Sequence, residues 1–380
     1  MFKNSIKKEN MIKSRIIGKV GEEETKSISL LCATLFAIHP VHVESVASIV
    51  GRADLLCCLF SLLAFFEYKN GNWIRSMIWI VIGTLSKEIA ITTVAILISY
   101  EIIEKILPQI IKSIKKASIK KTSNNEENIV NNFIDDDSRF SYKFSILKII
   151  CVSSILVGYL IFRKLMSADT VTVFRKVENP LIATEGLEKI LTMFYLHSFY
   201  VGLLLAPIQL CVEWSYNCIP TIKSISDYRN LFTLATYLFF IFVGLVGLNH
   251  YYIDQKRKTI LIGLIWFVIP FIPSSNIFVL VGTFIAERLL YVPSIGWCIL
   301  FSYIWWKWVP KTLKVVVKRE ESRNRIWKAM TGFILIFMIA RTMIRNEDWK
   351  TRDSIFLSSE NVCPNSAKRK KPNSLQKQIK

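Results

Sequence analysis

Long runs of apolar residues limit what this chain can fold into. The clearest runs cover residues 78–85, 89–103, 146–162, 231–248, 260–272 and 330–340. A helix needs about 20 apolar residues to cross the hydrocarbon core of a bilayer, and several runs reach that length once Ser, Thr and Gly are accepted within a helix. Because 52% of all residues are apolar, the pattern predicts an all-α, polytopic membrane protein and excludes a soluble enzyme.

The net charge of +20 is concentrated in short blocks between the apolar runs. These blocks are Lys3–Lys19, Lys112–Lys121, Lys256–Lys258 and Lys307–Arg325. Lys and Arg between membrane spans mark cytosolic loops. The charge therefore indicates membrane topology, and nucleic acid is not expected as a partner.

Following the chain from a cytosolic N-terminus gives about nine crossings. The predicted domain order is a basic cytosolic segment 1–27, spans in 28–107, a disordered cytosolic loop 108–144, a span at 145–165, a luminal region 166–230, spans in 231–344, and a luminal tail 345–380. The acidic residues 135–137 are expected to be solvated charges of the loop. By parity, the apolar stretch 191–206 makes no single crossing, so we expect it to be re-entrant or interfacial.

The eight cysteines are scattered, and no spacing among them suits zinc. Cys211 and Cys218 lie on one polar loop on the predicted luminal side. They form either a disulfide, if the loop faces an oxidising compartment, or two free thiols.

The densest polar group on the predicted luminal side is His39, His42 and Glu44, in the segment HPVHVE. These side chains are able to bind a metal ion, bind phosphate or transfer protons. Pro40 interrupts helical geometry between the two histidines. The alternative is an interfacial turn with satisfied polar groups, and the spacing alone favours this alternative slightly.

Further charged residues lie beside apolar runs on the same predicted side, where charges are costly and functional by default. Arg52 either holds an anion or pairs with Asp54, and Lys87 with Glu88 either joins the same site or forms a solvated turn. Glu287 and Arg288 interrupt the apolar stretch 284–291. Convergence of Arg52, Lys87 and Arg288 would suit a phosphate on a lipid-linked substrate.

Several segments resemble, in the same order, motifs of the transmembrane and TPR repeat-containing protein family. They are LFAIHPVHVESVASIVGRADLLCCLFSLLAFFEY (35–68), LSKEIAIT (85–92), FRKVENP (174–180), LCVEWSYNCIPTIKSISDYRNL (210–231), PFIPSSNIF (270–278), ERLLYVPSIG (287–296) and RNEDWKTRDSIFLSSENVCPNSAK (345–368). The resemblance covers roughly residues 28–368.

The resemblance implies a C-type glycosyltransferase (GT-C) helical bundle with luminal loops, in the endoplasmic reticulum membrane. Family members transfer mannose from dolichyl-phosphate mannose to Ser or Thr of secretory-pathway proteins, such as cadherins. The family also has an N-terminal acidic luminal loop that supplies the base, and C-terminal TPR repeats; this chain is expected to be a middle piece without them.

The hypothesis is an inverting transfer in which cations hold the leaving dolichyl phosphate. Arg52 and Arg288 are expected to bind phosphate with help from Lys87, and Glu287 to orient Arg288. His39, His42 and Glu44 would shape the site or assist proton transfer. No cofactor other than the lipid donor is expected, and no metal is assigned. The alternatives are a non-catalytic membrane scaffold or pseudoenzyme, and a transporter.

Overall fold

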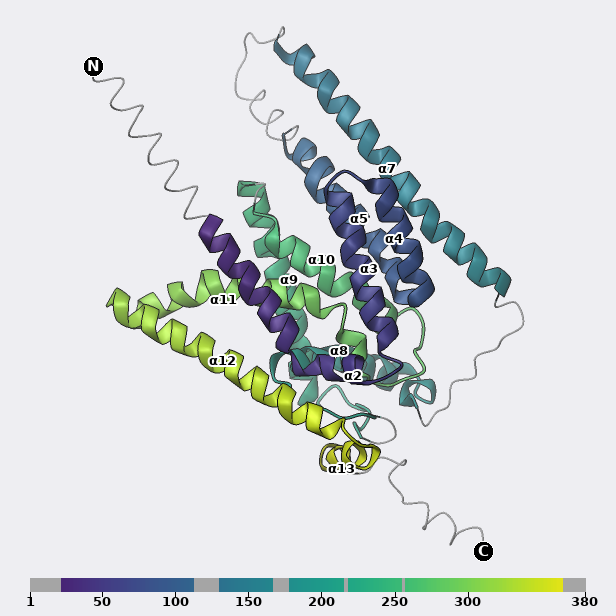
Figure 1. The fold of residues 1–380 in the computed structure, drawn as a ribbon, viewed down its shortest axis with the longest axis vertical. Coiled ribbons are helices and arrows are strands. Elements are labelled where there is room, and N and C mark those ends of the chain that lie inside the picture. The colour runs from purple at the N-terminus through teal and green to yellow at the C-terminus, as the bar shows by residue number, and fades with distance from the viewer. Residues whose placement is uncertain (1–21, 113–129, 167–177, 215–217, 255–256, 365–380) are drawn as a thin grey trace, which may run out of the picture.

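The computed structural model describes residues 22–112, 130–166, 178–214, 218–254 and 257–364. In these residues, all regular structure is helical (Figure 1). The predicted all-α class is therefore confirmed, and the helical architecture agrees with a GT-C-like membrane protein.

The first half of the chain forms a helix Glu22–Ile38, the short elements η1 (Pro40–His42) and α2 (Val43–Ala47), and the hairpin of α3 (Arg52–Lys69) and α4 (Trp73–Ser86). Next come η2 (Glu88–Ile91), α5 (Thr92–Glu101), the π-helical turn η3 (Ile102–Ile106) and α7 (Val130–Met166).

The second half begins with η4 (Pro180–Ile182) and α8 (Gly186–Leu205), followed by α9 (Arg229–Ile253), α10 (Thr259–Phe271) and η5 (Ile272–Ser274). It ends with η6 (Glu287–Leu290), α11 (Ser294–Val316), α12 (Glu320–Asp348) and α13 (Arg352–Val362).

Three helices in the described residues are long and apolar enough to cross a membrane: residues 143–166 of α7, α9 and α12. A fourth is added if the helix Glu22–Ile38 and the segment Pro40–Ala47, bent by 46°, form one broken span. Many apolar side chains of α7, α9 and α12 are exposed, as expected for surfaces that face lipid. The total of about nine crossings stays a prediction.

Two predicted boundaries differ from the structure. Residues 130–144 were expected to lie in a disordered loop, but they belong to α7. Extending an existing helix adds one hydrogen bond for each residue fixed, so a polar segment can continue an apolar helix. The first helix likewise includes residues 22–27, which we had placed in the N-terminal segment before the spans. The acidic residues 135–137 lie in α7, and residues 113–129 lie outside the described residues.

The segments that we assigned to opposite sides of the membrane gather at opposite ends of the bundle. At one end, the ion pairs are Glu24–Lys307, Glu67–Arg75 and Glu104–Lys258. At the other end lie α2, α8 and α13 (Figure 1), with the ion pairs Glu44–Arg288, Asp54–Lys87 and Glu287–Arg345. We call this second end the polar end.

Helix α8 contacts segments of the polar end at both of its own ends. Near its start, Thr221 donates a hydrogen bond to Glu188 at 2.6 Å. Near its finish, the carbonyl of Leu204 accepts a hydrogen bond from His39. An interfacial position would give this pattern, although the absence of a full crossing by residues 191–206 stays a prediction.

Helices α10 and α11 approach most closely at Gly296. A Cβ atom there would lie 2.1 Å from the backbone nitrogen of Phe267 and 2.3 Å from the carbonyl oxygen of Gly263. Gly296→Ala is therefore expected to lower the free energy of unfolding by about 1–3 kcal/mol or more, because backbone atoms must move apart. Thermal unfolding in detergent measures the effect.

Gly332→Ala in α12 is the matched control, because a Cβ atom at Gly332 meets nothing within 4 Å. It should leave stability unchanged or raise it by up to about 1 kcal/mol, since alanine favours helix. Equal effects of the two substitutions would contradict the close approach of α10 and α11.

Candidate functional site

The segment 39–44 forms a turn in which both histidines are buried and fully engaged. His39 Nε2 donates to the carbonyl of Leu204 at 3.1 Å, and its Nδ1 accepts from the amide of Val41 at 3.3 Å. His42 Nδ1 donates to the carbonyl of Phe36 at 2.7 Å, and its Nε2 lies 2.7 Å from Ser294 Oγ. With every ring nitrogen occupied, the turn with satisfied polar groups describes this segment better than a proton-transfer pair.

Glu44 follows this turn and is bound to Arg288 in two ways. Its Oε2 accepts a hydrogen bond from the backbone amide of Arg288 at 2.9 Å, and its Oε1 lies 3.7 Å from the Arg288 guanidinium. Glu44 is buried, whereas the side chain of Arg288 is 29% exposed. The pair therefore presents a partly accessible cation that is held by a fixed carboxylate.

The Glu44–Arg288 pair lines a cavity of about 460 Å³ at the polar end. This volume falls in the range of small-ligand sites. Two stretches form most of its lining, residues 212–214 and residues 282–286, and Glu178 completes it. We call it the polar cavity.

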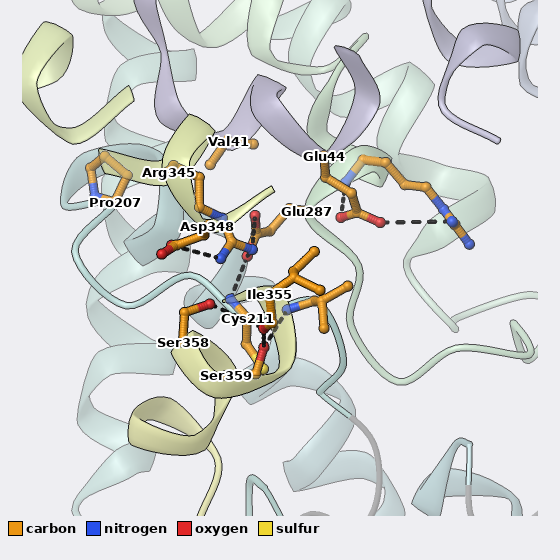
Figure 2. A network of polar contacts seen from close by, with 12 residues as sticks. Val41, Glu44, Pro207, Cys211, Glu287, Arg345, Asp348, Ile355, Ser358 and Ser359 are labelled. Atoms are coloured by element: carbon orange, nitrogen blue, oxygen red, sulfur yellow. Dashed lines mark hydrogen bonds and ion pairs between the residues drawn. The ribbon is translucent and has the colours of Figure 1, made fainter. Parts of the chain in front are cut away.

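Glu287 pairs with Arg345 and not with Arg288, so the expected orienting role of Glu287 toward Arg288 is corrected. The two Glu287 oxygens lie 3.4 and 3.3 Å from Arg345 Nη2, and Oε1 also accepts the amide of Cys211 at 2.7 Å (Figure 2). In the 3₁₀ turn η6, consecutive side chains diverge, so Glu287 and Arg288 find different partners. Burial is the largest influence on the pKa of Glu287 and raises it, while Arg345 opposes this rise.

The remaining predicted residues divide between the site and the surface. Lys87 forms an ion pair with the buried Asp54, whose carboxylate also interacts electrostatically with Arg288. Glu88 pairs instead with Arg163, and both of these side chains are exposed. Arg52 is exposed and has no ion-pair partner among the described residues. The structure thus brings Lys87 and Arg288 into one charged region around Asp54, and a role for Arg52 in phosphate binding stays a prediction.

The disulfide of the polar end joins Cys218 to Cys363, so Cys211 and Cys218 form neither the disulfide with each other nor the pair of free thiols that we considered. Cys211 is a buried free thiol. The loop that carries Cys211 and Cys218 packs on α13, with the Val212 amide donating to Ser359 Oγ at 3.3 Å. This packing brings Cys218 near a cysteine that is 145 residues away in sequence.

Sequence reasoning missed Arg345 and His197. Arg345 is 1% exposed, yet in sequence it follows an apolar run like any flanking cation, so no local signal marks it as buried. His197 bridges the hydroxyl of Tyr237 at 2.6 Å and the carbonyl of Ser275 at 2.7 Å. The position of His197 within the apolar run 191–206 could have marked it as a site residue, because a polar side chain buried among apolar residues needs hydrogen-bond partners.

In the described part of the chain, no group of three His, Cys, Asp or Glu side chains has the arrangement of a metal site. In particular, His39, His42 and Glu44 are directed to separate partners. The geometry of this segment therefore lends no support to the metal-binding alternative.

Comparison with known proteins gives consistent matches. Residues 168–241 match the family model described as protein O-mannosyl-transferase TMTC, DUF1736. Protein O-mannosyl-transferase TMTC3 of Homo sapiens is 32% identical over 354 residues, which is 90% of this chain and 36% of that protein. TMTC4 of Homo sapiens is 33% identical over 356 residues, covering 90% of this chain and 45% of the relative.

Over 90% of its length the chain is similar to proteins of the TMTC family. The more distant Tmtc3 of Drosophila melanogaster is 28% identical over 365 residues. The chain spans less than half the length of these curated relatives. No solved structure matches it.

Proposed function

We propose that this chain is a protein O-mannosyltransferase of the endoplasmic reticulum membrane. Its donor is dolichyl-phosphate mannose, and its acceptors are Ser or Thr hydroxyls of secretory-pathway proteins with cadherin-like domains. The proposal is supported by the names of its relatives, which are protein O-mannosyl-transferases. The single observation that carries it is the Glu44–Arg288 pair on the wall of the polar cavity.

The reaction exchanges one bond at the anomeric carbon of mannose. The acceptor oxygen forms a bond to this carbon while the bond from the carbon to the phosphate oxygen breaks, and dolichyl phosphate leaves. A carboxylate base takes the proton of the acceptor hydroxyl, and the resemblance places this base in the N-terminal acidic luminal loop of the family. Negative charge therefore grows on the departing phosphate, and a cation already in place stabilises it without reorganisation.

Arg288 suits this task by position and chemistry. Its guanidinium offers several N–H donors in a planar fork that matches phosphate oxygens. The contact with Glu44 fixes its backbone, and partial exposure leaves the guanidinium within reach of a ligand. Lys87 is a second cation in the same charged region, and it is 26% exposed.

The test uses the full chain in lipid vesicles with radiolabelled dolichyl-phosphate mannose and a cadherin-type extracellular domain. We expect mannose on Ser or Thr of the acceptor, detected by mass spectrometry, and no transfer from dolichyl-phosphate glucose. A sharp thermal transition would show that the chain is folded. If such a folded chain transfers no mannose, the proposal is contradicted and a non-catalytic membrane scaffold is favoured.

A further inference from the structure

Two walls of the polar cavity meet at one buried carboxylate, that of Glu287. The η6 wall is formed by residues 282–286 and Arg288, and the loop wall by residues 212–214. Glu287 directly precedes Arg288 of the η6 wall, and it accepts the amide of Cys211, which directly precedes the loop wall, at 2.7 Å. A single side chain therefore connects the two walls.

Arg345, from the last turn of α12, holds this carboxylate in place. Its side chain is 1% exposed and that of Glu287 is fully buried, so neither charge is stabilised by water. Figure 2 shows the Arg345 guanidinium between Glu287 and Asp348, which lies 3.4 Å from Nη1. Removal of Arg345 would leave the carboxylate of Glu287 without its counter-charge in a buried place, which is strongly unfavourable.

We infer that Arg345 and Glu287 are positioning residues that set the separation of the two walls and so the geometry of Arg288 toward its substrate. This inference rests on the proposed function for its reaction, but the arrangement of the walls can be tested without it. The contact between Ser359 of α13 and Val212 supports the same arrangement, because it holds the loop wall from the side of α13.

A role in packing alone would not need these charges. Replacing a buried ion pair by apolar residues of similar volume is often neutral or stabilising. Glu287, however, accepts the Cys211 amide and so ties the loop wall to the η6 wall, and methionine at this position would offer only a weak sulfur acceptor. The double substitution Arg345→Met with Glu287→Met therefore separates packing from positioning.

The experiment measures hydrogen exchange of the full chain in lipid nanodiscs, together with thermal unfolding and mannosyl transfer. In Arg345→Met, amides of residues 207–214 and 282–291 should exchange roughly tenfold to a hundredfold faster, as expected for a weakened bond to a charged group. In the double variant, the unfolding midpoint should return to that of the wild type. In both variants, mannosyl transfer should be slower than in the wild type. In the double variant, amide exchange in residues 207–214 and 282–291 should remain as fast as in Arg345→Met.

Arg323→Met is the matched control, because Arg323 lies at the opposite end of α12 and pairs with Glu320. It should leave exchange in both walls unchanged. Wild-type protection and wild-type transfer in the double variant would overturn the inference, since packing would then suffice. A third outcome is that the variants show the expected exchange pattern but no protein, including the wild type, transfers mannose. That result would support the wall arrangement and overturn the proposed function.

Discussion

Arg288→Gln is expected to slow mannosyl transfer by roughly 10²–10³-fold, the usual effect of losing one donor aimed at developing negative charge. Arg288 is the partly exposed cation of the polar cavity, and its side chain is 29% exposed beside the buried Glu44. Glutamine keeps hydrogen-bonding capacity but removes the charge that stabilises the leaving phosphate. The measurement is the transfer rate at saturating donor, with the unfolding midpoint recorded in parallel.

Two further variants separate this electrostatic role from a folding defect. Arg288→Lys keeps the charge without the planar fork, so its rate should lie between those of the wild type and Arg288→Gln. Arg163→Gln removes an exposed arginine that pairs with the exposed Glu88, and it should have little effect because exposed ion pairs contribute little. Wild-type rates in a stable Arg288→Gln variant would exclude Arg288 from phosphate binding.

Cys218→Ser is expected to lower the free energy of unfolding by about 2–5 kcal/mol, the usual cost of losing a native disulfide. The Cys218–Cys363 bond closes a loop with a sequence separation of 145 residues and fastens α13 to the loop before α9. A disulfide stabilises mainly by restricting the unfolded chain. Membrane spans inside this loop already restrict it, so we expect a loss in the lower half of the range of about 2–5 kcal/mol. Thermal unfolding with and without reductant measures the change.

A reductant should have the same effect on the wild type as the substitution, and it should add nothing to Cys218→Ser. Cys151→Ser in α7 is the control, because Cys151 is a partly buried free thiol. Cys211→Ser should likewise leave the reductant response intact. An unchanged midpoint in Cys218→Ser would show that the disulfide contributes nothing to the stability of the polar end.

The sequence was sufficient to predict the helical class, the similarity to the TMTC family and the location of several charged residues of the site. Apolar runs such as 231–248 became α9 because a chain in lipid must satisfy its backbone within the segment, and helices do so locally. Glu44 and Arg288 stood out for a related reason, since charges beside apolar runs need partners. Each of these inferences depends on residues close together in the chain.

Only the tertiary structure decided which partners meet. Glu287 forms an ion pair with Arg345 rather than with its neighbour Arg288, and Cys218 forms a disulfide with Cys363 rather than with Cys211. Glu44 meets an arginine 244 residues away. A local sequence shows that a buried charge requires a counter-charge, but the identity of that counter-charge depends on which helix ends are packed together, and packing is a property of the whole bundle.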